Sequence, residues 1–220
     1  MKFIITIIII IISNISELIA NENVTDLKQN KNRYILASYS NLDLIIQNKY
    51  GLNFGFINEY NIYNEPYRSV EIDIMHSHVG KTTEYMEDTR ISFYKRVITK
   101  EIMPQLFYGC SYFDTLVNFG NNRIGRLTGG YYNSNISYRF QSLGLNIGLG
   151  NRWYVNENFI FSIDWVSWAQ PIYILNKYSN YLDTNLPVSE RDNFVKASTL
   201  TLINYFPRFT FLKLQIGILF

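Results

Sequence analysis

The segment RFTFLKLQIGILF, residues 208–220, decides the fold that the sequence predicts. Large apolar side chains occupy every second position at its end, namely Leu212, Leu214, Ile216, Ile218 and Phe220. The positions between them hold Lys213, Gln215, Gly217 and Leu219. Because successive side chains of a β-strand point to opposite faces, this pattern predicts a strand with one apolar face and one polar or small face. No residue follows Phe220 to cover the apolar face, so we expect that face to meet lipid.

A hairpin with the same alternation is predicted upstream, over residues 143–154 and 159–168. In its first strand the apolar side chains alternate with small ones, Gly144, Asn146, Gly148 and Gly150. In its second strand Phe159, Phe161, Ile163 and Trp165 alternate with Ile160, Ser162, Asp164 and Val166. Glycines on the inner face of a strand suit a small barrel, in which bulky neighbours need room.

With these two features the sequence resembles the small outer-membrane β-barrel proteins of Gram-negative bacteria. The resemblance implies a closed antiparallel transmembrane barrel, located in the outer membrane and surrounded by outer-membrane lipids and lipopolysaccharide. It also implies that the barrel assembly machinery reads the terminal strand and its final aromatic residue. The assembly signal in this sequence would be Leu214, Ile216, Gly217, Ile218 and Phe220.

The composition agrees with one exported domain. The chain has 220 residues, a formal charge of +2 and 17% charged residues, below the roughly 25% of soluble domains. A near-neutral net charge gives no indication of a basic surface that would bind nucleic acid. Residues 1–20 have the short apolar run of a signal peptide, residues 21–32 are expected to form a periplasmic leader, and residues 33–220 the barrel. Cys110 is the single cysteine, so no intrachain disulfide can form.

Eight strands are predicted by counting segments with period-two alternation. They cover residues 34–41, 52–60, 70–77, 90–97, 105–112, 143–154, 159–168 and 208–220. With Phe220 in the periplasm, the links near residues 64, 100 and 156 are short and periplasmic, while residues 78–89, 113–142 and 170–207 form long outer loops. Residues 189–192 resemble a helix capping box, so residues 194–206 are predicted to be helical, with a strand as the alternative.

The charged side chains on the inner faces are predicted to form a network that fills the lumen. An eight-stranded barrel is just wide enough for side chains, and unpaired buried charge is costly. The predicted network consists of Glu59, Glu71, Asp73, Arg90, Arg96, Arg152, Asp164 and Lys213. Four of these are acidic and four basic, which argues against strong ion selectivity if a narrow solute path exists.

Aromatic residues near the predicted strand ends suggest an interfacial girdle, with an ordinary aromatic core as the alternative. They are Trp153, Tyr154, Trp165, Trp168 and Tyr173.

His76 and His78 are weak candidates for a metal site, because at spacing two they share one face of a strand. Ser77 points to the opposite face, so a serine–histidine pair within this strand has poor geometry. No cofactor is expected. We therefore predict a monomeric, non-enzymatic outer-membrane barrel with a structural or surface-interaction role. A lipid-modifying barrel enzyme, a narrow channel for small solutes and a soluble exported barrel with an apolar cavity are the alternatives.

Overall fold

The computed structural model describes residues 31–43, 48–60, 66–81, 84–97, 104–118, 137–155, 158–179 and 205–220. The strands in this part of the chain are β1 (Arg33–Ser40), β2 (Leu42–Asp43), β3 (Lys49–Tyr60), β4 (Pro66–Gly80), β5 (Tyr85–Val97), β6 (Gln105–Asn118), β7 (Ser137–Tyr154), β8 (Phe159–Ser179) and β9 (Arg208–Leu219). Across the described residues, no helix has the length and apolar character needed to cross a membrane.

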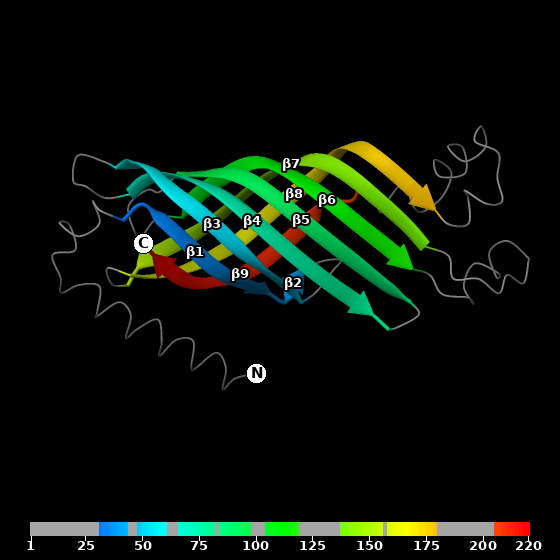
Figure 1. Ribbon diagram of the computed structural model, residues 1–220, viewed down its shortest axis with the longest axis horizontal. Coiled ribbons are helices and arrows are strands. Elements are labelled where there is room, and N and C mark those ends of the chain that lie inside the picture. Colours follow the sequence, from blue (N-terminus) through cyan, green and yellow to red (C-terminus); the bar gives the residue numbers. More distant parts are fainter. Residues whose placement is uncertain are drawn as a thin grey trace, which may run out of the picture.

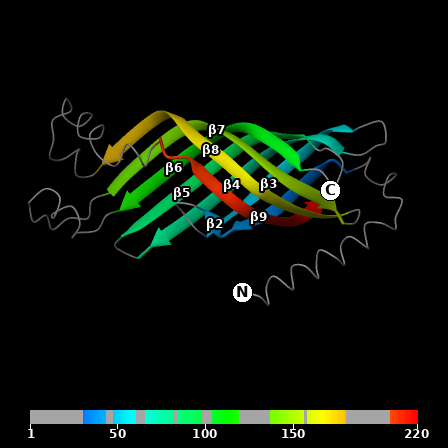
Figure 2. The same ribbon diagram turned by 180° about the vertical axis from the view of Figure 1, so that it is seen from behind.

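Eight of these strands form a closed antiparallel ring, drawn from the side in Figure 1. Each strand pairs with its successor from β3 to β9, and β1 pairs with both β3 and β9. The short β2 continues the direction of β1 and also pairs with β9. Figure 2 shows the opposite wall, where β8 and β9 lie side by side. The prediction of an all-β, closed eight-stranded barrel is therefore confirmed.

The strands at the end opposite Phe220 are longer than the sequence predicted. β6 continues to Asn118, β7 begins at Ser137 and β8 continues to Ser179, so the predicted loops over residues 113–142 and 170–207 are too long. The predicted loop over residues 78–89 is wrong. β4 and β5 instead meet at a tight turn, in which Gly80 has a φ of 127° and Lys81 N donates to Glu84 O over 2.8 Å.

The polarity of the wall matches the alternation of the sequence. Large apolar side chains point outward and are exposed, among them Leu52, Phe54, Ile72, Ile74, Phe93, Leu145, Ile147, Leu214, Ile216 and Ile218. In β9, Lys213 and Gln215 are buried on the inner face, between the exposed Leu212, Leu214 and Ile216. Gly144, Asn146, Gly148 and Gly150 also face inward, as predicted.

One irregularity crosses β8 and β9 at the same level. Asp164 pairs with Lys213 and Val166 pairs with Phe211, which leaves Trp165 opposite Leu212 without a ladder pair. Leu212 has a φ of 51°, a left-handed conformation that is uncommon outside glycine. Phe211 and Leu212 are both exposed, whereas Thr210 and Lys213 on either side of them are both buried. The inner and outer positions of β9 therefore exchange parity at this level.

The predicted signal peptide and most of the predicted leader lie outside the described residues, as does most of the predicted helix over residues 194–206. These assignments remain predictions.

Candidate functional site

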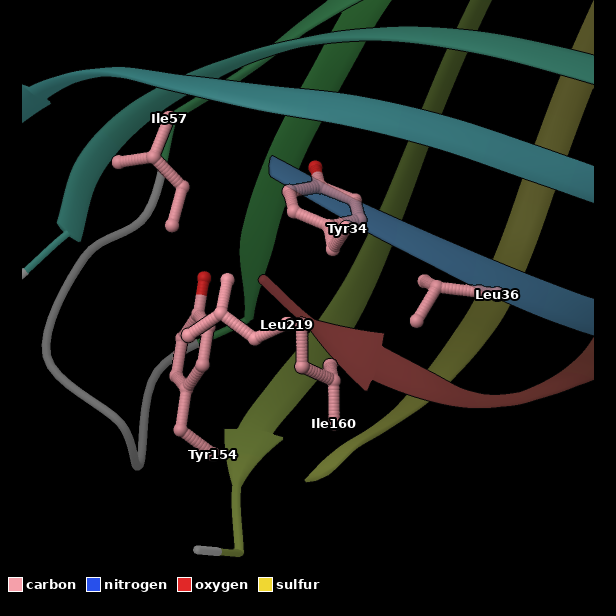
Figure 3. Close-up of a cluster of buried hydrophobic side chains, with 6 residues drawn as sticks. All are labelled: Tyr34, Leu36, Ile57, Tyr154, Ile160 and Leu219. Carbon is pink, nitrogen blue, oxygen red and sulfur yellow. The ribbon is translucent and has the colours of Figure 1, made fainter. Parts of the chain in front are cut away.

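The interior of the barrel is the candidate site, and its Phe220 end contains an apolar cluster. Six buried side chains from five strands meet there: Tyr34, Leu36, Ile57, Tyr154, Ile160 and Leu219. Figure 3 shows these side chains gathered inside the ring of strands. Leu36 and Ile160 are fully buried. Alternation alone predicted an inward Leu219, but it did not predict that five further side chains would converge on it.

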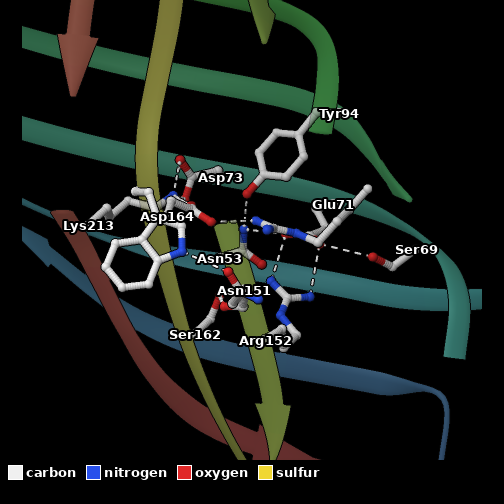
Figure 4. Close-up of polar contacts among 12 residues, drawn as sticks. Asn53, Ser69, Glu71, Asp73, Tyr94, Asn151, Arg152, Ser162, Asp164 and Lys213 are labelled. Carbon is white, nitrogen blue, oxygen red and sulfur yellow. Dashed lines mark hydrogen bonds and ion pairs between the residues drawn. The ribbon is translucent and has the colours of Figure 1, made fainter. Parts of the chain in front are cut away.

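A buried ion network lies next to this cluster and is centred on Glu71 in β4 (Figure 4). Arg96 Nε donates to Glu71 Oε1 over 3.0 Å. Arg152 donates to both carboxylate oxygens, over 2.9 and 3.1 Å. Asn53 Nδ2 and Ser69 Oγ each add a hydrogen bond of 2.9 Å. One carboxylate thus accepts from two guanidinium groups and two neutral donors, which compensates the cost of removing these charges from water.

The network continues across the lumen through Asp164, Lys213 and Asp73. Arg96 Nη2 donates to Asp164 Oδ1 over 2.9 Å, and Lys213 Nζ lies 3.1 Å from Asp164 Oδ2. Lys213 Nζ also donates to both oxygens of Asp73 over 3.2 Å. Arg90 Nη2 is more distant, at 4.0 Å from Asp73 Oδ2. Cations and anions therefore alternate from Arg152 to Arg90 and connect five strands through side chains.

Aromatic rings hold the two central guanidinium groups in place. Arg96 lies 4.6 Å from the centroid of the Phe107 ring, and Arg152 lies 4.6 Å from that of Tyr34. The Tyr34 hydroxyl also accepts from Arg152 Nη1 over 2.5 Å. The two rings occupy the space over Gly55 and Gly148, where a Cβ atom would overlap them. Glycine at these positions therefore makes room for the rings that support the network.

Seven of the eight predicted lumen charges are buried in this network: Glu71, Asp73, Arg90, Arg96, Arg152, Asp164 and Lys213. The side chain of Glu59 lies outside the described residues.

Among the residues that the structure describes, sequence reasoning missed three buried charges, Lys49, Asp88 and Arg208. Lys49 and Asp88 extend strands that were predicted too short. Arg208 has the parity of Leu212, which predicts an outward position, but the irregularity at Leu212 turns it inward. Arg208 Nε lies 3.6 Å from Asp88 Oδ1, and Thr115 Oγ1 donates to the same oxygen over 2.6 Å.

The two histidines face outward, near the end of the barrel opposite Phe220. His76 Nδ1 lies 2.9 Å from Thr89 Oγ1, and His78 Nδ1 lies 3.0 Å from Glu87 Oε1. Ser77 is buried on the inner face and donates to the carbonyl oxygen of Asp88 over 3.2 Å. Within the described part of the chain, no group of three or more His, Cys, Asp or Glu side chains could hold a metal ion.

The predicted aromatic girdle needs one correction. Trp165, Trp168 and Tyr173 are exposed on the outer face, whereas Tyr154 points inward and belongs to the apolar cluster. Trp165 Nε1 donates to Asn151 Oδ1 over 2.7 Å. This bond satisfies an amide that would otherwise be exposed to the apolar surroundings of the wall.

Outside the apolar part of the wall, Asp114 and Arg139 form a bidentate ion pair with distances of 2.8 and 2.5 Å. The hydrogen bonds from Arg139 hold the pKa of Asp114 below its usual value. Both side chains point outward and lie farther from the Phe220 end than Tyr112 and Leu143. The apolar outer surface of β6 and β7 therefore ends at this level.

Comparison with known proteins adds little. No family model matches the sequence, and no curated protein is matched by sequence. Among solved structures, the N-terminal β-barrel domain of Pseudomonas aeruginosa OprF is similar, with a TM-score of 0.42 and 13% identity over 86% of this chain and 98% of that domain. The assignment as a small β-barrel therefore rests on the strand pairing and polarity of this chain.

Proposed function

We propose that this chain is a non-enzymatic outer-membrane β-barrel with a structural or surface-interaction role. The observation that carries the proposal is the inverted polarity of the barrel, with apolar side chains exposed outside and charged side chains buried inside. A soluble exported barrel with an apolar cavity requires the reverse arrangement. In lipid, a closed barrel also leaves no unpaired strand edge within the hydrocarbon region.

The longer connections support outward contacts at the end opposite Phe220. The chain between β6 and β7 spans residues 119–136, and that between β8 and β9 spans residues 180–207. At the Phe220 end, the connections span residues 61–65, 98–104 and 155–158. Long outer loops and short periplasmic turns are typical of bacterial outer-membrane barrels. We therefore place Phe220 at the periplasmic side and the partner-binding loops at the cell surface, next to lipopolysaccharide.

The terminal strand is the proposed recognition element for the barrel assembly machinery. Leu214, Ile216, Ile218 and Phe220 form its exposed outer row, whereas Gly217 faces inward against the backbone of β1. No observation favours the lipid-modifying enzyme, because Ser77 and the two histidines lie on opposite faces of β4.

Cell fractionation combined with heat-modifiable gel migration tests the proposal. We expect the protein in the outer-membrane fraction, with an unheated band that migrates differently from the heated one, because closed barrels resist detergent until they are heated. A protein released in soluble form from the periplasm, without a heat-dependent shift, would contradict the proposal.

A further inference from the structure

We infer that the apolar cluster at the Phe220 end, and not the ion network, seals the barrel against water and ions. This inference rests on the proposed membrane location. It goes beyond that proposal by naming the side chains that form the barrier.

The ion network and the apolar cluster are two obstacles in the lumen, and they differ in chemistry. An ion that passes the network meets carboxylates, guanidinium groups and an ammonium group, which can replace part of its hydration shell. An ion that reaches Leu36, Ile57, Ile160 and Leu219 meets carbon atoms, which cannot. Apolar constrictions of this kind exclude water as well as ions. The cluster is therefore the higher barrier of the two.

The apolar cluster lies on one arc of the ring. It draws side chains from β7, β8, β9, β1 and β3, which are consecutive neighbours and make up five of the eight strands of the ring. Tyr34 belongs to the cluster and also accepts a hydrogen bond from Arg152, so the two obstacles are adjacent. A path along this arc of the lumen passes both of them in series. Loosening the network alone leaves the cluster in place.

Single-protein conductance in planar lipid bilayers tests the inference with the full-length chain. The double variant Leu36→Ser/Ile160→Ser replaces two fully buried apolar side chains with small polar ones. We expect its conductance to exceed that of the unmodified protein by roughly tenfold or more, because a polar constriction stays wet.

Two control variants test whether a rise in conductance is specific to the apolar cluster. Asp73→Asn/Lys213→Gln removes an ion pair of the network and should leave the conductance near that of the unmodified protein. Leu145→Ser/Ile147→Ser places the same type of change on the outer face and should also leave the lumen closed. Heat-modifiable migration verifies that each variant is folded. If the serine variant of the cluster does not fold, Leu36→Ala/Ile160→Ala replaces it, with the same expected direction.

A folded cluster variant that conducts no better than the unmodified protein would overturn the inference. A network variant that opens the barrel as widely as the cluster variant would do so as well. Failure of the unmodified protein to enter bilayers or to shift on heating would instead contradict the proposed function.

Discussion

The apolar cluster around Ile160 and the ion network around Glu71 fill neighbouring parts of one lumen by different means. The cluster is held by packing, since its side chains exclude water from the Phe220 end of the barrel. The network is held by charge-assisted hydrogen bonds that offset a large desolvation cost. The lumen is therefore filled by two components. The stability of the cluster should respond to changes in side-chain volume, and that of the network to changes in charge at constant volume.

The largest expected effect comes from Glu71→Gln. This substitution keeps the size of the side chain but removes the charge that both Arg96 and Arg152 contact, which leaves buried cations without compensation. We expect a loss of roughly 3–5 kcal/mol in the free energy of unfolding. Urea-induced unfolding of the lipid-reconstituted barrel measures it.

Glu87→Gln is the matched control, because Glu87 forms an exposed pair with His78. We expect a change below roughly 1 kcal/mol there. Equal effects of the two substitutions would show that the network does not stabilise the barrel.

The next effect tests packing in the apolar cluster. Ile160→Ala deletes buried carbon atoms without any change in charge, and we expect it to cost about 2–4 kcal/mol through lost burial and a residual cavity. Ile147→Ala, on the exposed outer face, provides the comparison in the same unfolding assay and should cost less. A larger loss for the outer substitution would place the packed core outside the ring.

A smaller effect is expected at Tyr34, which joins the two regions. Tyr34→Phe keeps the ring in the apolar cluster and over Arg152 but removes the hydroxyl that accepts from Arg152 Nη1. We expect a loss of about 1.5–3 kcal/mol, the usual range for a hydrogen bond to a charged group. The double variant Tyr34→Phe/Glu71→Gln tests whether the two residues are coupled. If its loss in the free energy of unfolding equals the sum of the two single losses, Tyr34 is not part of the network.

The smallest effect concerns the Asp114–Arg139 pair outside the lumen. Because the pKa of Asp114 is lower in the folded state than in the unfolded state, the pair stabilises the barrel above the unfolded pKa of about 4. That stabilisation is lost as the pH falls through the folded value. The difference between the unmodified protein and Asp114→Asn should shrink from at most roughly 1 kcal/mol near neutral pH toward zero in acid. A difference that grows as the pH falls would contradict this assignment.

Alternation in the sequence was sufficient for the ring and for most of the lumen. A strand between lipid and a polar interior must place apolar and polar side chains on opposite faces, so residues 212–219 of β9 and the β7–β8 hairpin up to Trp165 could be predicted residue by residue. The same rule identified Glu71, Asp164 and Lys213 as inward charges before their partners were known.

The wrong predictions have physical causes that the alternation of apolar and polar residues does not reveal. A parity change arises where Trp165 and Leu212 lie opposite each other without pairing, and nothing in a single strand indicates it. That change turned Arg208 inward. The strands beyond the apolar surface, such as the outer half of β6, have polar side chains on the outside, so their sequence looks like a loop although the backbone ladder continues. The convergence of Leu36 and Ile160 depends on ring closure, which brings β1 next to β9.

The central claim is that the outer face meets lipid and the inner face does not, and Cys110 offers a direct test. Cys110 is the single cysteine of the chain and is exposed on the outer face of β6, next to the buried Ser111. A spin label on Cys110 in lipid vesicles should collide with oxygen, which concentrates in the acyl chains, and should be shielded from a water-soluble nickel chelate. A label that is accessible to the chelate and shielded from oxygen would contradict the account.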